Sequence, residues 1–468
     1  MPSKTTKNVP TYIKSLTLEN IRCFGSKQEL SLLKSDGTLP QWTLLLGDNG
    51  VGKTTLLQCL VWMRPIANIE KRGIKEQEIG VKPALDDEED NEVFFQLIRS
   101  KKSKVSKRMQ SEIEAEFLEE TPFNKNVRTS LKVWATGIQM ISIGKKFTEY
   151  KILQGKKSKQ KAEGEVNLIT YSASRRPGKA KIEKNDLSDP LAGIFDETTQ
   201  LYSPEDILQW LHHAALTEKD ERREERSAQL LEIMKEMLVE ILPDLKNIAD
   251  IQIRGPEGVS FSMPYGYVPF SHISLGYKTT LTWTVDLAWR LIRTYKDSPN
   301  PLAEPAVVLI DEIDLHLHPL WQRKIIDFLS KHFPKTQFIA TAHSPLMVQA
   351  AIDSNHAVLK QNGEEVEINN NPMATYGWRI DQILTSDFFD LPTSRGPEYE
   401  SLLEERKTLL DKKRRTPSEN NELMTIEKRL AELPTSEKPE DIEAMKLIRD
   451  AAAILRNDKD ISSLDKNK

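Results

Sequence analysis

The chain has 468 residues and a mass of 53.5 kDa, enough for about three domains or for one large domain with insertions. Hydrophobic residues make up 38% and charged residues 29%, a mixture that excludes a wholly disordered chain. No apolar run approaches the roughly 20 residues that span a bilayer, and a net charge of −4 excludes a polycation built to coat nucleic acid.

The cysteine count and the N-terminus indicate a compartment. Cys23 and Cys59 are too few for a disulfide framework or a cysteine metal site, which favours a reducing environment. Residues 1–4 lack the apolar segment of a secretory signal, and residues 1–10 are polar and expected to be disordered. We therefore expect a cytoplasmic protein.

The first elements alternate strand and helix. Residues 12–20 have the period-2 pattern of a half-buried strand, and residues 29–32 are expected to pair with them. The apolar run 42–46 predicts a buried strand that leads into a glycine loop, and residues 54–63 are predicted to be helical.

Two insertions are expected on this core. Residues 68–165 carry weak patterns and two lysine-rich tracts, and we interpret them as loops. Such tracts either contact the phosphates of DNA or RNA or are simply solvated. Residues 200–245 are predicted to form a helical insertion, with helices over 204–213 and 218–242.

Strands and helices continue to alternate towards the C-terminus. Strands are predicted over 167–171, 306–310 and 337–341, with a helix over 320–332 between the last two. This order predicts an α/β fold, in which a head domain spans residues 11–355.

The composition changes after residue 355. Leucine and isoleucine recur at helical spacing among charged residues, which predicts helices over 397–415, 418–433 and 438–456. We interpret residues 356–468 as a C-terminal helical region for partner docking or oligomerisation.

The glycine loop fits the phosphate-loop pattern G-x4-G-K-[ST]. Its backbone N–H groups would surround phosphates at the positive end of the following helix. Lys53 would neutralise the β- and γ-phosphates, and the Thr54 hydroxyl would bind Mg²⁺. The predicted ATP-binding residues here are Gly47, Asp48, Asn49, Gly50, Val51, Gly52, Lys53, Thr54 and Thr55.

An acid pair supplies the second half of the site. The five apolar residues 306–310 predict a buried strand, and Asp311 and Glu312 follow it at the end where open α/β sheets bind ligands. Asp311 would hold Mg²⁺, and Glu312 would act as the general base on the attacking water. His343, after the next strand, would reach the γ-phosphate as a second catalytic residue.

Residues 271–277 resemble the Ser-x-Gly signature of ABC-type ATPases. In that superfamily Ser274 and Gly276 would contact the nucleotide of a second subunit, so two chains would sandwich two ATP molecules about a two-fold axis. The alternative is that Ser274 caps a helix over 279–292, and both roles are compatible.

His316 and His318 form a His-x-His pair, which is a common metal-ligand spacing. No further ligand cluster accompanies them in the sequence, so we favour a loop at the dimer interface over a metal site.

Longer stretches of sequence resemble a known family. Residues 171–176, 310–322 and 333–345 are similar to the OLD-like ATPases of anti-phage systems, and residues 376–384 with the charged helices after them resemble the PtuA family. PtuA is the ATPase subunit of the Septu defence system and of related retron modules. The resemblance implies an ABC-type, SMC-like ATPase head with a central mixed sheet, a helical insertion and a C-terminal helical region.

The same resemblance implies a partner, the HNH nuclease PtuB. No nuclease motif is visible in this chain, so we expect cleavage to be carried out by the partner. ATP would then gate the partner's cleavage. The glutamine that normally couples Mg²⁺ to the insertion is not identified among those of residues 96–139, and Arg22 resembles an arginine that approaches the nucleotide in compact heads.

Two other functions remain open. A RecF-like repair ATPase would bind DNA directly, and the lysine tracts favour it. A scaffold with a degenerate nucleotide site is the third, against which the intact Lys53, Asp311, Glu312 and His343 argue.

Overall fold

We analysed a computed structural model of the chain. It describes residues 10–64, 110–119, 125–134, 137–143, 166–180, 189–254, 258–370, 372, 376–391, 393–412 and 414–431. Two compact units are present, Met1–Asp390 and Leu391–Lys468. The expected disorder of residues 1–10 and the helix expected over 438–456 fall almost entirely outside the described residues.

A six-stranded mixed sheet forms the centre of the first unit. Its strand order is β16 (Glu365–Asn369), β15 (Asn355–Asn362), β3 (Trp42–Gly47), β14 (Thr336–Thr341), β13 (Ala306–Ile310) and β7 (Leu168–Tyr171). All neighbours pair in parallel except β15 and β16. The predicted α/β class with a central mixed sheet is confirmed.

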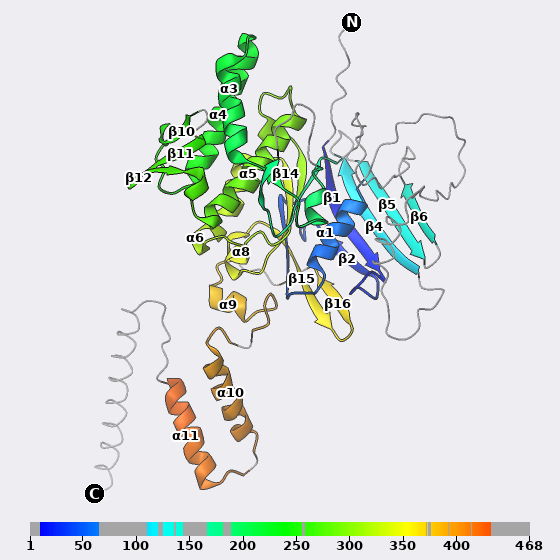
Figure 1. Cartoon of the computed structure of the whole chain (residues 1–468). Coiled ribbons are helices and arrows are strands. Elements are labelled where there is room, and N and C mark those ends of the chain that lie inside the picture. The colour runs from blue at the N-terminus through cyan, green and yellow to red at the C-terminus, as the bar shows by residue number, and fades with distance from the viewer. Residues whose placement is uncertain are drawn as a thin grey trace. The chain divides into compact units, whose positions relative to one another are not determined.

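Both faces of this sheet are covered, which explains why its strands are continuous apolar runs. In β3, Leu44 and Leu46 pack into one core, and Leu45 packs into a second core behind the sheet. The first core includes residues of α3 (Pro204–Thr217), α4 (Glu221–Ile241) and α5 (Leu275–Thr294), and the second includes residues of α1 (Lys53–Trp62) and β1 (Thr11–Glu19). Figure 1 shows these two groups of elements on opposite sides of β14.

An antiparallel sheet builds the second layer. Its order is β2 (Gln28–Ser31), β1, β4 (Gln110–Glu119), β5 (Lys125–Trp134) and β6 (Gly137–Ile143). The predicted pairing of residues 29–32 with the first strand is confirmed, with Leu16 opposite Leu30. Two smaller sheets are β8 (Pro177–Ala180) with β9 (Leu201–Tyr202), and β10 (Ile251–Arg254), β11 (Gly258–Met263) and β12 (Gly266–Pro269).

The prediction of loops over residues 68–165 is wrong for the described part of this segment, which forms β4, β5 and β6. In β4 the side chains of Ile113, Ala115 and Phe117 are buried and the glutamates between them are less so. This period-2 alternation is a strand signal that the high charge obscured. The helical insertion is present as α3 and α4.

Three other boundaries differ from expectation. The helix expected over 320–332 is two helices, α6 (Pro319–Gln322) and α7 (Ile325–His332), and the one expected over 279–292 begins earlier, at Leu275 of α5. The start of the expected C-terminal helical region is strand, because β15 and β16 extend the central sheet. The helices α8 (Pro345–Ala350) and α9 (Ile380–Leu384) complete the first unit.

The second unit is described as a helical hairpin of α10 (Pro397–Leu410) and α11 (Pro417–Ala431) (Figure 1). Leu409, Leu423 and Ile426 form its small core. Exposed ion pairs such as Arg406 with Glu427, 3.3 Å apart, contribute little stability. Within the described residues, no helix is both long and apolar enough to cross a membrane.

His356 of β15 makes the stability of the first unit dependent on pH. Burial lowers its pKa to about 4 from the ordinary 6.5, and its buried Nε2 has no hydrogen-bond partner within the part of the chain that the structure describes. Between these two values the unfolded chain binds a proton that the folded chain does not, so stability falls as the pH falls from about 6.5 to about 4.

Replacing His356 with leucine should therefore reduce the loss of unfolding free energy across that pH window. Urea denaturation at pH 7 and pH 4.5 measures it, with His272→Leu, a change at an exposed histidine, as the matched control. An equal loss of stability in the parent and in His356→Leu would contradict the prediction.

Candidate active site

The loop from Gly47 to Thr54 runs from the last residue of β3 into the first turn of α1. Gly47 has φ +140°, and a Cβ there would lie 2.4 Å from the carbonyl oxygen of Leu359, so only glycine fits at the close approach of β15. The sheet thereby fixes the first residue of the loop.

Lys53 folds back inside this loop. Its Nζ donates hydrogen bonds to the carbonyl oxygens of Gly47 (2.8 Å) and Asp48 (2.7 Å). Burial lowers the pKa of Lys53, and the nearby carboxylates of Asp311 and Glu312 oppose that change. A buried ammonium near the loop amides makes the local electrostatic potential positive, which favours a bound anion.

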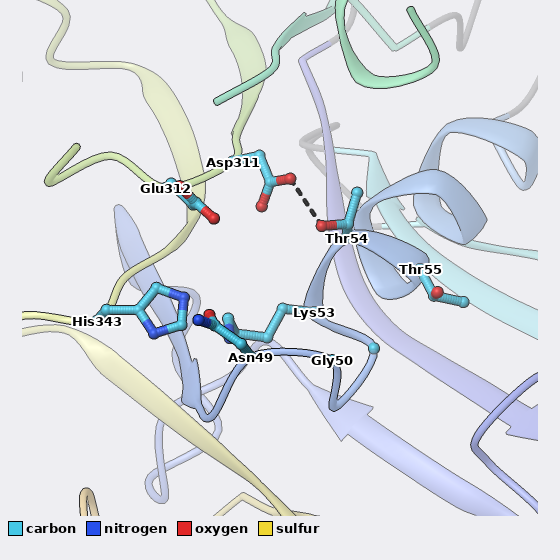
Figure 2. A pocket seen from close by; sticks show the side chains of 9 residues that line it. Asn49, Gly50, Lys53, Thr54, Thr55, Asp311, Glu312 and His343 are labelled. Carbon is cyan, nitrogen blue, oxygen red and sulfur yellow. Dashed lines mark hydrogen bonds between the residues drawn. The ribbon is translucent and has the colours of Figure 1, made fainter. Parts of the chain in front are cut away.

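The acid pair follows β13 as predicted and faces the loop across a pocket of about 240 Å³ (Figure 2). The Thr54 hydroxyl donates to Asp311 Oδ2 at 2.7 Å. The pocket is lined by Asn49, Gly50, Gly52, Lys53, Thr54, Thr55, Asp311, Glu312 and His343.

Thr341, the last residue of β14, organises both acids. Its hydroxyl donates to Asp311 Oδ1 at 2.7 Å and accepts the backbone N–H of Glu312 at 2.6 Å. Glu312 has φ +49°, which is unusual for a residue with a side chain and indicates local strain. The neighbouring strand therefore holds Glu312 in an unfavourable conformation.

His343 enters the pocket from the loop after β14. Its backbone N–H donates to Asp314 Oδ2 at 2.9 Å, which ties the histidine to the loop that follows the acid pair. Figure 2 shows the imidazole on the same side of the pocket as Glu312. Both side chains can thus reach one group bound between them and the loop.

The signature residues lie elsewhere. Ser274 and Gly276, at the start of α5, are not among the residues that line the pocket, and Leu275 between them is 61% exposed. Ser274 occupies the cap position of α5, but its side chain makes no capping hydrogen bond. A Cβ on Gly276 would lie 2.8 Å from the carbonyl oxygen of His316, so the signature packs on the loop after the acid pair.

Residues 43–349, more than half of the chain, match the family model "AAA domain, putative AbiEii toxin, Type IV TA system". The chain belongs to this family. The matched region runs from the start of β3 to the end of α8 and so contains the whole pocket.

Relatives of this AAA-domain chain include Septu and retron proteins. It is 32% identical over 176 residues to the Septu protein PtuA of Bacillus mycoides, covering 37% of this chain and 24% of that one. It is 42% identical over 140 residues to the Retron Ec83 probable ATPase of Escherichia coli, covering 30% and 25%. The matches thus span about a quarter of each relative, and the resemblance to PtuA expected from the sequence is confirmed.

Among solved structures, the SMC head domain from Thermotoga maritima matches with a TM-score of 0.41 and 13% identity, covering 77% of this chain and 99% of that chain.

Several residues of this AAA-domain site were not found by sequence reasoning. Thr341 acts through two hydrogen bonds to the acid pair and Asp314 through one to His343, and no local sequence pattern signals these contacts. Arg22, noted from the sequence, lies against α1, where its NH1 donates to Thr55 Oγ1 and Gln58 Oε1, both at 3.1 Å. The coupling glutamine sought within 96–139 lies outside the residues whose side chains are described.

One of the two histidines that suggested a metal makes a hydrogen bond in a helix cap. His318 caps α6, where its Nδ1 accepts the N–H of Leu320 at 3.3 Å. Across the described part of the chain, no group of three or more His, Cys, Asp or Glu residues is arranged to hold a metal ion.

Thr341→Val should lower the unfolding free energy by about 1–3 kcal/mol, because it leaves the Glu312 N–H and Asp311 Oδ1 without their partner. Thr43→Val is the matched control. The Thr43 hydroxyl is buried and no described residue forms a hydrogen bond with it, so its removal should be neutral or stabilising. Urea denaturation of both variants decides, and equal effects would show that the Thr341 bridge carries no energy.

Proposed function

We propose that this chain binds ATP with Mg²⁺, hydrolyses it, and uses the nucleotide state to regulate a partner nuclease in anti-phage defence. The observation that carries the proposal is the convergence of Lys53, Thr54, Asp311, Glu312 and His343 on one pocket from segments nearly 300 residues apart. The family match and the defence relatives support it.

The pocket suits the phosphates of a nucleotide. The glycine loop opens α1, whose N-terminal amides and dipole favour an anion. Lys53 would exchange its bonds to the Gly47 and Asp48 carbonyls for bonds to the β- and γ-phosphates. The nucleotide would thus replace contacts within the loop.

Thr54 and Asp311 fit a magnesium ion. A hydroxyl and a carboxylate oxygen are hard donors of the kind that Mg²⁺ prefers, and here they already meet at 2.7 Å. These two residues would hold the ion together with the nucleotide. Bound Mg²⁺ would neutralise charge on the phosphates.

Glu312 and His343 would carry the chemistry. Glu312 would accept a proton from a water molecule as its oxygen attacks the γ-phosphorus. The bond from that phosphorus to the bridging oxygen then breaks, which yields ADP and inorganic phosphate. His343 would donate a hydrogen bond to the γ-phosphate and so steady the transferring group.

Dimerisation would complete the site. Ser274 and Gly276 stand outside the pocket of their own chain, and Leu275 beside them is exposed. We propose that they contact ATP bound to a second copy across a two-fold axis, so that ATP stabilises the dimer and hydrolysis weakens it.

The regulated partner is proposed to be an HNH nuclease of the PtuB type, since relatives of this chain belong to the Septu system. The helical hairpin of α10 and α11 and the residues after it are the proposed docking surface. A RecF-like role with direct DNA binding is the alternative that the experiments below separate.

Lys53→Ala should raise the Kd for ATP at least tenfold, because it removes the only lysine among the residues that line the pocket. Glu312→Gln should retain ATP binding but lose about 100-fold or more of the hydrolysis rate. Fluorescent nucleotide titration and phosphate release measure the two effects. Lys27→Ala, at an exposed lysine, is the control, and normal turnover in Glu312→Gln would refute the assigned base.

Affinity purification of the tagged chain from cells that carry its neighbouring genes should recover an HNH nuclease. Deleting residues 397–468 should abolish this recovery while ATP binding persists. Retained nuclease binding would refute the docking assignment. Recovery of DNA without a nuclease, with ATP hydrolysis that DNA stimulates, would favour the repair ATPase.

A further inference from the structure

Arg175 is a buried cation beside the acid pair with no role assigned above. It lies in the loop that follows β7 and is 2% exposed. Its NH2 group donates a hydrogen bond to the backbone carbonyl of Glu312. The indole of Trp283, from α5, lies below the guanidinium, 5.9 Å from Cζ to the ring centroid.

The burial of the Arg175 guanidinium reduces the stability of the fold. Its Nε and Nη1 atoms are buried and have no hydrogen-bond partner among the described residues, and Arg175 has φ +33°. A buried arginine with unpaired donors and strained backbone is poor for stability, so its placement calls for a functional reason.

The acids around Arg175 supply part of that reason. Burial lowers the pKa of Arg175 to about 10, while Asp314, Asp311 and Glu312 act in the opposite direction. The group therefore stays charged at neutral pH. It offers a fixed positive charge next to the carboxylates without occupying the pocket, because it is not among the pocket-lining residues.

Glu312 is thus held from both sides of its backbone. The Thr341 hydroxyl accepts a hydrogen bond from the Glu312 N–H, and the Arg175 guanidinium donates one to the Glu312 carbonyl. These two contacts fix a residue whose φ of +49° is disfavoured for a side chain of this size. Loss of either contact would let the Glu312 backbone relax and carry its carboxylate away from the pocket.

The loop that carries Arg175 is itself anchored. Tyr171, the last residue of β7, donates its hydroxyl proton to Asp286 Oδ2 at 2.8 Å, and Arg290 Nε donates to the same atom at 2.6 Å. Asp286 and Arg290 both belong to α5. Arg175 is therefore seated between α5 and the acid pair.

We propose that Arg175 is a positioning residue that holds the Glu312 backbone in the conformation required for hydrolysis. The inference rests on the proposed ATPase function, since it presumes that Glu312 is the base. This positioning role differs from a purely structural role because the hydrolytic step depends on Arg175 and nucleotide affinity does not.

The test compares Arg175→Gln, Arg175→Lys and Arg176→Gln in the full chain. Arg176 is the exposed neighbour in sequence and serves as the matched control for loss of charge. Stopped-flow or steady-state phosphate release gives kcat, titration with a fluorescent ATP analogue gives Kd, and thermal melting reports folding.

We expect Arg175→Gln to lower kcat about 10- to 100-fold with Kd changed less than twofold. Arg175→Lys should recover part of the rate, because an ammonium can still donate to the Glu312 carbonyl. Arg176→Gln should match the parent. An unchanged kcat in Arg175→Gln, or parallel losses of kcat, affinity and melting temperature in both Arg175 variants, would overturn the proposal.

Measurements on the parent chain distinguish failure of the proposed ATPase function from failure of the positioning role of Arg175. If the parent neither binds nor hydrolyses ATP, the proposed function fails. If the parent turns over ATP and only the Arg175 variants behave differently from expectation, the ATPase function stands and the positioning role is rejected. Should Arg175→Gln not fold, Arg175→Lys alone decides, through its ratio of kcat to affinity against the parent.

Discussion

The hydrogen bond between Thr54 and Asp311 is the contact on which the candidate site depends. It joins the first turn of α1 to the end of β13 across 257 residues of sequence. Parallel pairing of β3, β14 and β13 brings the carboxyl ends of these strands to one sheet edge. The sheet topology therefore decides which side chains meet, and local loop geometry decides how they are aimed.

Strain and burial are concentrated around that contact. Glu312 and His316 have positive φ values on the same loop, and the buried cations Lys53 and Arg175 lie near the carboxylates of the acid pair. Each of these features costs stability by itself, and the double-sided hydrophobic core supplies the rigidity that maintains them. Such a distribution is typical of a site arranged for chemistry.

Sequence reasoning predicted the parts of the site that depend on local patterns. The glycine loop with Lys53 and the acid pair after an apolar strand carry their chemistry within a few residues, and the structure brings them together in the pocket. Thr341 and Arg175 escaped notice because their roles arise from hydrogen bonds to the acid pair, which no local sequence pattern signals. Strand β4 escaped because its glutamates raise the charge of a segment whose alternate residues are buried.

The self-contacts of Lys53 have a consequence for energetics. Because the Lys53 ammonium donates hydrogen bonds to the carbonyls of Gly47 and Asp48, any anion that binds Lys53 would have to compete with these two contacts. A weakly charged anion would gain too little binding free energy from this exchange. A polyphosphate would offer several oxygens in place of the two carbonyl oxygens that Lys53 gives up. For the proposed ATPase, this competition would make the loop selective for ligands by their charge.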